Sequence, residues 1–293
     1  MSKNLRHELR TAVFKSFAER QDKHAARAAG QTSGRVFSYG ARGALLDMSN
    51  NFAGWMRENH PSVRSPQDVQ PDHVAAFLQS KQAAGCTTAT LATYRSDLAK
   101  IGHLVGCDYS APQIRGADRR DDRGAGHAMP AEMVDRLADY AVSHPSGSAC
   151  AFLIGRETGG RVNDVRRAVY DRENDVIHMT GKGGKSYPDR PISTDFGRLM
   201  ETPEFSRYIG ENGRFRLPQA DSINRWLSRA ETRIFGASRY SFHDLRRACA
   251  QAHYDERRRA GDDIRAALRD TSQWLNHGPN RDDLLRQSYI VVW

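Results

Sequence analysis

The chain has 293 residues, of which 39% are hydrophobic and 27% charged, so it is long enough for one large globular domain or two ordinary ones. Its 44 Lys and Arg outnumber its 35 Asp and Glu, and the net charge of +9 favours a polyanionic partner such as nucleic acid. Nothing in it predicts a membrane span or a signal peptide, and four scattered cysteines predict neither a zinc site nor a disulfide framework.

Periodic apolar residues in the first hundred positions predict a small helical bundle. One stripe at helical spacing consists of Leu45, Met48, Phe52, Trp55 and Met56. Pro71 opens a later helix that Gly85 closes. Thr87 or Thr88 is the expected N-cap of the helix that follows. The predicted helices cover residues 5–29, 39–59, 72–84 and 87–105.

The composition changes after this bundle. The stretch APQIRGADRRDDRGAGH holds Gly, Pro and dense charge, with almost no apolar residue after Ile114. Such a stretch is typical of a linker. We therefore expect a helical domain over residues 1–112, a basic linker over 113–127 and a second domain over 128–293. A long loop within a single domain is the alternative.

The second part is predicted to be mostly helical with a small sheet. Its first helix covers residues 130–144, and 148–169 predict a helix, a Gly-Gly turn and a second helix. Residues 175–193 predict two short strands around a GKGGK turn. Further helices are expected over residues 199–209, 220–234, 243–259 and 262–275. The fold class is therefore mainly α with a small β-sheet (α+β).

Four short motifs in this part carry side chains suited to phosphate chemistry. The motifs are ETGGRVNDV, TGKGGKS, SFHDLRRACA and the closing LNHG…SYI. Each motif taken alone has a commoner explanation without function. In the same order, these are a surface arginine, a tight hairpin, a solvated His-Arg pair and a packed tyrosine. Together they supply the candidate catalytic residues Arg161, Lys182, His243, Arg246, His277 and Tyr289.

Cleavage of a phosphodiester needs a nucleophile, stabilisation of the charge on phosphorus and a proton for the leaving oxygen. Tyr289 is a candidate covalent nucleophile, and with an ordinary pKa of about 10 it needs an acceptor or a positive field. Arg161 and Arg246 are suited to the non-bridging oxygens. His243 and His277 are suited to proton exchange. No paired acidic cluster accompanies the set, so we expect neither a metal nor another cofactor.

The ordered set of motifs resembles the tyrosine recombinases, the phage-integrase and Xer-type family. That family combines Arg in a TGxR turn, Lys in a GKGxK hairpin, HDLRH, LGH and a final Tyr. The match extends from Met129 to the end, and TTATLATYRSDLAKI resembles the family's core-binding domain. The resemblance implies a core-binding domain over residues 1–112 and a catalytic domain over 128–293.

The resemblance implies a site-specific recombinase that acts through a 3′-phosphotyrosine and integrates or excises a mobile element. The resemblance also implies that Lys182 is the general acid, and Lys185 is the alternative residue for this role. Asp164 and Asp244 are expected to orient the catalytic residues beside them. Expected partners are double-stranded DNA, three further copies in a homotetramer on two synapsed sites, and DNA-bending or directionality factors, with no membrane partner. A cytoplasmic, nucleoid-associated protein is expected. The alternatives are a type IB topoisomerase and a catalytically silent DNA-binding relative.

Two groups of residues are expected to contact DNA. The linker arginines are suited to phosphate contacts that do not depend on base sequence. The remaining candidates follow from the resemblance of the bundle and the hairpin. The full DNA-binding set is Arg119, Arg120, Arg123, Thr87, Thr88, Tyr94, Arg95 and Lys185.

The chain also departs from the family pattern. Gly160 stands before the first arginine, where many members carry a bulky apolar residue, and we expect it to loosen the turn. Only Ile290, Val291, Val292 and Trp293 follow the tyrosine. In relatives a longer segment docks on a neighbouring subunit, so here either another surface docks or the last three residues form a small apolar plug.

Overall fold

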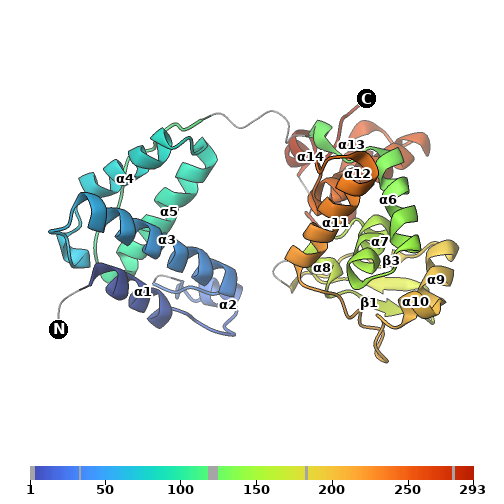
Figure 1. Cartoon of the computed structure of the whole chain (residues 1–293), viewed down its shortest axis with the longest axis horizontal. Coiled ribbons are helices and arrows are strands. Elements are labelled where there is room, and N and C mark those ends of the chain that lie inside the picture. The colour runs from blue at the N-terminus through green and yellow to red at the C-terminus, as the bar shows by residue number, and fades with distance from the viewer. Residues whose placement is uncertain (1–3, 33, 118–124, 182–183, 279–280) are drawn as a thin grey trace. The chain divides into compact units, whose positions relative to one another are not determined.

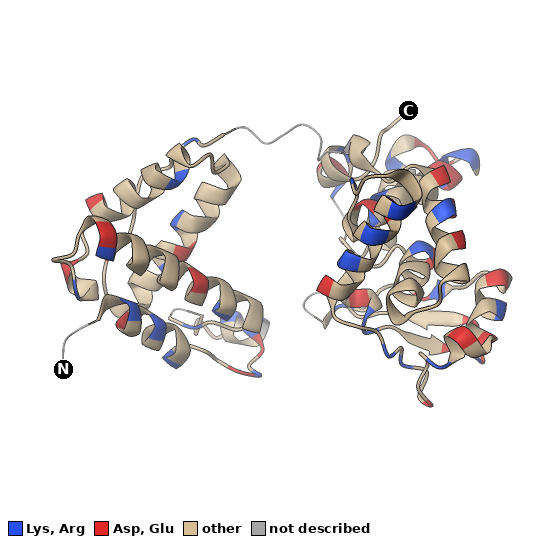
Figure 2. Ribbon diagram, viewed as in Figure 1, with Lys and Arg blue, Asp and Glu red and all other residues tan. Residues whose placement is uncertain are grey.

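The computed structural model describes residues 4–32, 34–117, 125–181, 184–278 and 281–293 (Figure 1). The chain divides into two compact units, residues 1–120 and 121–293. Each unit has its own hydrophobic core. Lys and Arg lie on helices of both units, so positive charge is not confined to one of them (Figure 2).

The first unit is a bundle of helices. Four of the stripe residues, Leu45, Met48, Phe52 and Met56, are buried in its core, and Trp55 packs against it half-buried. The Thr87 hydroxyl caps the last helix by accepting from the Thr90 amide. The elements are α1 (Leu5–Lys15), α2 (Lys23–Ala28), α3 (Tyr39–Asn59), the 3₁₀ turn η1 (Pro66–Asp68), α4 (Pro71–Ala83) and α5 (Thr88–Val105).

The prediction of one helix over residues 5–29 is wrong. The chain leaves α1 after Lys15, and Phe17 forms an isolated β-bridge with Val36. The Ala18 amide donates to the Val36 carbonyl at 2.9 Å, and the Val36 amide donates to the Ser16 carbonyl at 2.9 Å. This pairing buries Val36 and overrides the local helical preference, as tertiary contacts commonly do.

The segment after α5 extends the first unit. The Gly116 amide donates to the Thr88 hydroxyl at 3.0 Å, and the Ala117 amide donates to the Cys86 carbonyl at 3.1 Å. A Cβ atom on Gly116 would lie 2.2 Å from the Cys86 carbonyl oxygen, so only glycine allows this approach. The start of the predicted linker is thus held against α4 and α5.

The second unit is built around α7, whose residues from Ala149 to Gly155 are all buried. Helices α6, α11 and α12 pack around α7 (Figure 1). The elements are η3 (Ala125–His127), α6 (Ala131–Ser143), α7 (Gly147–Thr158), α8 (Val162–Val165), β1 (Val169–Asp171), β2 (Val176–His178), β3 (Arg190–Pro191), α9 (Thr194–Glu201), α10 (Pro203–Ser206), α11 (Ala220–Phe235), α12 (Phe242–Arg259), α13 (Ile264–Trp274) and α14 (Asp282–Ser288).

The small sheet has the antiparallel order β1-β2-β3. Strands β2 and β3 flank the GKGGK segment, which confirms the predicted hairpin. The helix predicted to end at Val169 ends at Val165 instead, and β1, which was not predicted, begins at Val169. The predicted helix over 199–209 is wrong, because it is split into α9 and α10 at Pro203. Proline lacks an amide donor and forces Thr202 into an extended conformation.

The predicted fold class, mainly α with a small sheet, is confirmed. Among the described residues, no helix combines the length and apolar character needed to cross a bilayer.

Candidate active site

Arg161 stands at the turn between α7 and α8. Gly159 ends α7 with φ of 61°, and a Cβ there would lie 2.3 Å from the Trp274 ring. A Cβ on Gly160 would lie 2.8 Å from the Met179 sulfur. The expectation that Gly160 loosens this turn is therefore wrong, because Met179 fills the space a larger side chain would need.

The Arg161 guanidinium makes two contacts within the unit. Its Nη1 donates to the Tyr187 hydroxyl at 3.0 Å and to Asp164 Oδ2 at 3.5 Å. The side chain remains 32% exposed, so part of the guanidinium faces solvent. Asp164 also accepts from Arg167, as expected of an orienting partner.

Arg246 is the second arginine and is fully buried on α12. Its Nη1 donates to the Gly159 carbonyl at 2.5 Å, and its Nη2 donates to the Leu275 carbonyl at 2.6 Å. Nη2 also lies 3.4 Å from His277 Nε2. This guanidinium therefore joins the end of α7 to the end of α13 and faces the last predicted histidine.

Tyr289 lies between the two predicted histidines. Its ring centroid is 5.3 Å from that of His243 and 5.1 Å from that of His277, both edge-on. The Arg246 Cζ lies 5.8 Å from the same ring. Tyr289 is only 4% exposed, yet its hydroxyl forms no hydrogen bond with any other described residue.

Both histidines are held in the neutral state. Burial, with added repulsion from Arg246 and Arg161, lowers the pKa of His277 to about 3. Burial and the charges of Arg247 and Arg246 lower the pKa of His243 to about 4. At neutral pH both imidazoles are therefore uncharged, and the lone pair of His277 Nε2 faces the Arg246 Nη2 donor.

Asp244 anchors the start of α12. It accepts from the Ser241 amide and hydroxyl, both at 2.7 Å, and pairs with His127 and Arg247. Burial alone would raise the pKa of Asp244, but these hydrogen bonds outweigh it and lower the pKa. Asp244 thus stays ionised and orients its neighbours.

The helix that carries Tyr289 is tied to α12. Arg247 Nε donates to the Ser288 carbonyl at 2.7 Å. Beyond Tyr289, the Val291 amide donates to Gln251 Oε1 at 2.8 Å, and Trp293 Nε1 donates to Asp255 Oδ1 at 2.8 Å. The final residues thus lie along α12 of the same chain, with Ile290 buried and Val291 and Trp293 exposed.

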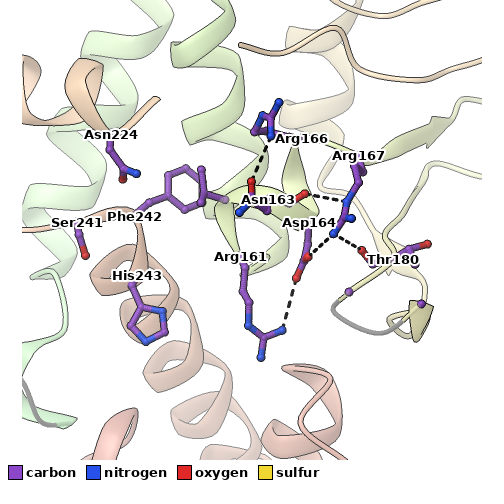
Figure 3. A pocket seen from close by; sticks show the side chains of 13 residues that line it. Arg161, Asn163, Asp164, Arg166, Arg167, Thr180, Asn224, Ser241, Phe242 and His243 are labelled. Carbon is purple, nitrogen blue, oxygen red and sulfur yellow. Dashed lines mark hydrogen bonds and ion pairs between the residues drawn. The ribbon is translucent and has the colours of Figure 1, made fainter. Parts of the chain in front are cut away.

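A pocket of about 750 Å³ opens beside Arg161 and His243. Figure 3 shows His243 and Ser241 on one side of Arg161, with Arg167 and Thr180 on the other. Its polar lining was only partly predicted. The polar lining residues that were not predicted are Asn163, Arg166, Arg167, Thr180, Asn224 and Ser241. Tyr187 and Arg247, which contact Arg161 and Asp244, were not predicted either.

The remaining predicted residues lie partly within and partly outside the described ranges. Lys182, Arg119, Arg120 and Arg123 lie outside the described residues. Lys185 is exposed, and its carbonyl accepts from the Gly181 amide and Asn276 Nδ2.

Of the predicted contacts in the first unit, Thr87 and Thr88 use their hydroxyls within the unit, and Tyr94 and Arg95 are half-buried on α5. Among the described residues, no group of three His, Cys, Asp or Glu side chains is placed to hold a metal ion.

No protein-family model and no curated protein matches the sequence. Solved structures do match the fold over most of the chain. XerH site-specific recombinase bound to its difH substrate gives a TM-score of 0.63 at 14% identity, over 96% of this chain and 89% of that one. A lambda integrase dimer bound to a COC′ core site gives 0.59 at 15%, over 89% and 93%. Tn1549 transposon integrase with circular intermediate DNA gives 0.56 at 11%, over 97% and 95%.

Proposed function

We propose that this chain, which has the fold of the tyrosine recombinases, is a site-specific DNA recombinase that cuts and rejoins strands through a 3′-phosphotyrosine. The observation that carries the proposal is the Tyr289 ring between His243 and His277, with the guanidinium of Arg246 against it. Arg161 joins them through the Tyr187 hydroxyl. The DNA held by the three similar structures supports double-stranded DNA as the partner.

In the proposed reaction the Tyr289 oxygen attacks the scissile phosphorus, and the bond to the 5′ oxygen breaks. Arg161 and Arg246 stabilise the charge that grows on the non-bridging oxygens. The neutral imidazole of His243 accepts the phenolic proton, and Lys182 protonates the leaving 5′ oxygen. The phosphotyrosine bond keeps the energy of the cleaved bond, so a second 5′-hydroxyl reverses the steps on an exchanged strand.

The wider biology belongs to the same proposal. Four copies would act on two synapsed sites to integrate or excise a mobile element, helped by DNA-bending or directionality factors. The linker arginines Arg119, Arg120 and Arg123 would contact the DNA backbone. Recovery of recombinant junctions from cells that carry the gene tests this part.

The chemistry is tested with nicked suicide substrates drawn from DNA flanking the gene. Wild-type protein should form a protein–DNA adduct that survives denaturation, and Tyr289→Phe should form none. Tyr254→Phe is the matched control, because Tyr254 is buried in the same cluster and its hydroxyl has no partner among the described residues. An adduct with Tyr289→Phe would contradict the nucleophile assignment.

The same assay separates the alternatives. Relaxation of supercoiled plasmids without site preference would favour a type IB topoisomerase. Tight DNA binding with no adduct on any bound site would favour a catalytically silent relative. The independent helical core of the first unit supports the recombinase over the topoisomerase.

A further inference from the structure

The return arm of the hairpin contacts the catalytic cluster at several points. The Lys185 carbonyl accepts from Asn276 Nδ2 at 3.1 Å, immediately before His277. The Arg190 guanidinium donates to the Trp274 carbonyl and stacks on the Trp274 ring, with Cζ 4.3 Å from its centroid. In the sequence, Tyr187 lies between Lys185 and Arg190, and its side chain is buried with 5% exposed.

The Tyr187 hydroxyl is shared by three charged groups. It accepts from Arg161 Nη1 at 3.0 Å and lies 3.4 Å from Arg246 Nη1, while it donates to Asp164 Oδ2 at 2.8 Å. A phenolic oxygen has one hydrogen and a limited capacity to accept, and these contacts use it fully. One neutral atom thus lies between the two guanidiniums.

A neutral spacer has a particular electrostatic effect. Two guanidiniums repel each other, and a carboxylate between them would hold them together but would also neutralise the positive charge. Tyr187 instead fixes both arginines through hydrogen bonds and keeps Asp164 farther from Arg161, at 3.5 Å. The neutral hydroxyl therefore leaves the positive charge of Arg246, whose other partners are neutral carbonyls and an imidazole, without a carboxylate against it.

The surrounding structure holds the hydroxyl in place and in its protonated form. The Tyr187 amide donates to the Met179 carbonyl at 2.9 Å, which fixes the register of the hairpin. Burial raises the pKa of Tyr187, although Arg246 and Arg161 act to lower it. The phenol therefore keeps its proton for Asp164 at neutral pH.

We propose that Tyr187 is a positioning residue that sets the spacing of Arg161 and Arg246 for the two non-bridging oxygens of the scissile phosphate. This inference rests on the proposed function. Tyr187 acts through the arginines and does not itself touch the reacting atoms. Its hydroxyl was absent from the predicted site because no motif marks it.

The test compares Tyr187→Phe with Tyr170→Phe in single-turnover adduct formation. Tyr170 lies on β1, is 4% exposed and donates its hydroxyl to Asp175 at 3.3 Å, away from both arginines. Tyr187→Phe keeps the packed ring and should slow cleavage by about 10- to 100-fold, the usual effect of misplaced catalytic groups. Tyr170→Phe should cleave at the wild-type rate, and both should bind DNA like wild type.

A second substrate separates positioning from a general structural role. A neutral methylphosphonate at the scissile position lacks one non-bridging oxygen, so the spacing of two arginines loses its importance. The defect of Tyr187→Phe relative to wild type should therefore shrink on this substrate. Equal defects on both substrates, a wild-type rate on phosphate, or loss of the folded state in thermal unfolding would overturn the inference. Absence of a wild-type adduct would instead overturn the proposed function.

Discussion

At the scale of single residues, the two imidazoles beside Tyr289 differ from ordinary histidines in the pH at which they take up a proton. Burial, together with the charges of surrounding arginines, lowers the pKa of both, to about 4 for His243 and about 3 for His277. Ordinary histidines titrate near pH 6.5. The site therefore keeps both imidazoles neutral throughout the physiological range.

This protonation predicts the pH dependence of the proposed cleavage. The rate of adduct formation should show no inflection near pH 6.5 and should fall only as the pH approaches about 4, where His243 takes up a proton. Single-turnover assays between pH 5 and 8 test whether the inflection near pH 6.5 is absent. An inflection near pH 6.5 that His243→Gln or His277→Gln removes would contradict neutral imidazoles.

The same shifts affect stability. Between pH 6.5 and about 4 the unfolded chain binds protons at these histidines and the folded chain does not, so stability falls as pH falls and is unaffected by them above 6.5. The limit is about 1.4 kcal/mol per pH unit for one proton, reduced by solvent contact. In urea unfolding at pH 7.5 and 5, His277→Gln should lose less stability than wild type, and the exposed His7→Gln should match wild type.

At the scale of elements, α14 depends on α12 for its place. Arg247 donates to the Ser288 carbonyl, directly before the proposed nucleophile Tyr289, and pairs with Asp244 at the start of α12. Asp244 in turn is held by Ser241 and His127. The position of Tyr289 is thus set from the N-terminal end of α12.

Loss of this tether should affect chemistry more than binding. Arg247→Ala should lower the rate of adduct formation about 10- to 100-fold, because the nucleophile is no longer oriented. Hydrogen exchange of α14 amides should become faster, while DNA affinity changes little. Arg259→Ala, an exposed change on the same helix, is the control. Wild-type exchange in α14 of Arg247→Ala would show that another contact holds the helix.

The elements also show what a sequence can predict. The side chains of five residues in short local motifs lie together in the structure, as expected from the sequence: Arg161, His243, Arg246, His277 and Tyr289. Their catalytic roles stay a prediction. Tyr187 was not expected among them, since its role depends on how the hairpin packs against α7, α12 and α13.

The predicted end of the first helix was wrong for a related reason. The break after Lys15 depends on Val36, which lies about twenty residues later and carries no local signal. Long-range pairing of this kind overrides helical periodicity.

At the scale of the whole molecule, the chain folds around two separate hydrophobic cores and carries a net charge of +9. Phosphate contacts release counterions from DNA, so binding should weaken steeply as salt rises. For the three linker arginines, this salt dependence leads to a quantitative prediction. Changing Arg119, Arg120 and Arg123 together to Ala should flatten the slope of log affinity against log salt by about 0.9 for each lost contact, or up to about 2.7.

The control keeps the charge. The same three positions changed to Lys should retain the wild-type slope, because the electrostatic contribution needs the charge and not the forked geometry. Filter binding on a single DNA fragment between low and moderate salt measures it. An unchanged slope in the Ala variant would remove these arginines from the set of phosphate contacts.

The contact between Gly160 and Met179 has a consequence for evolution. Because Met179 and Val165 fill the space above Gly160, a larger residue at 160 fits only if one of them becomes smaller. Homologues of this chain should therefore vary at positions 160 and 179 in a compensating manner. A bulky residue before the first arginine would accompany a small one at the end of β2, and collections of such homologues would show the two positions covarying.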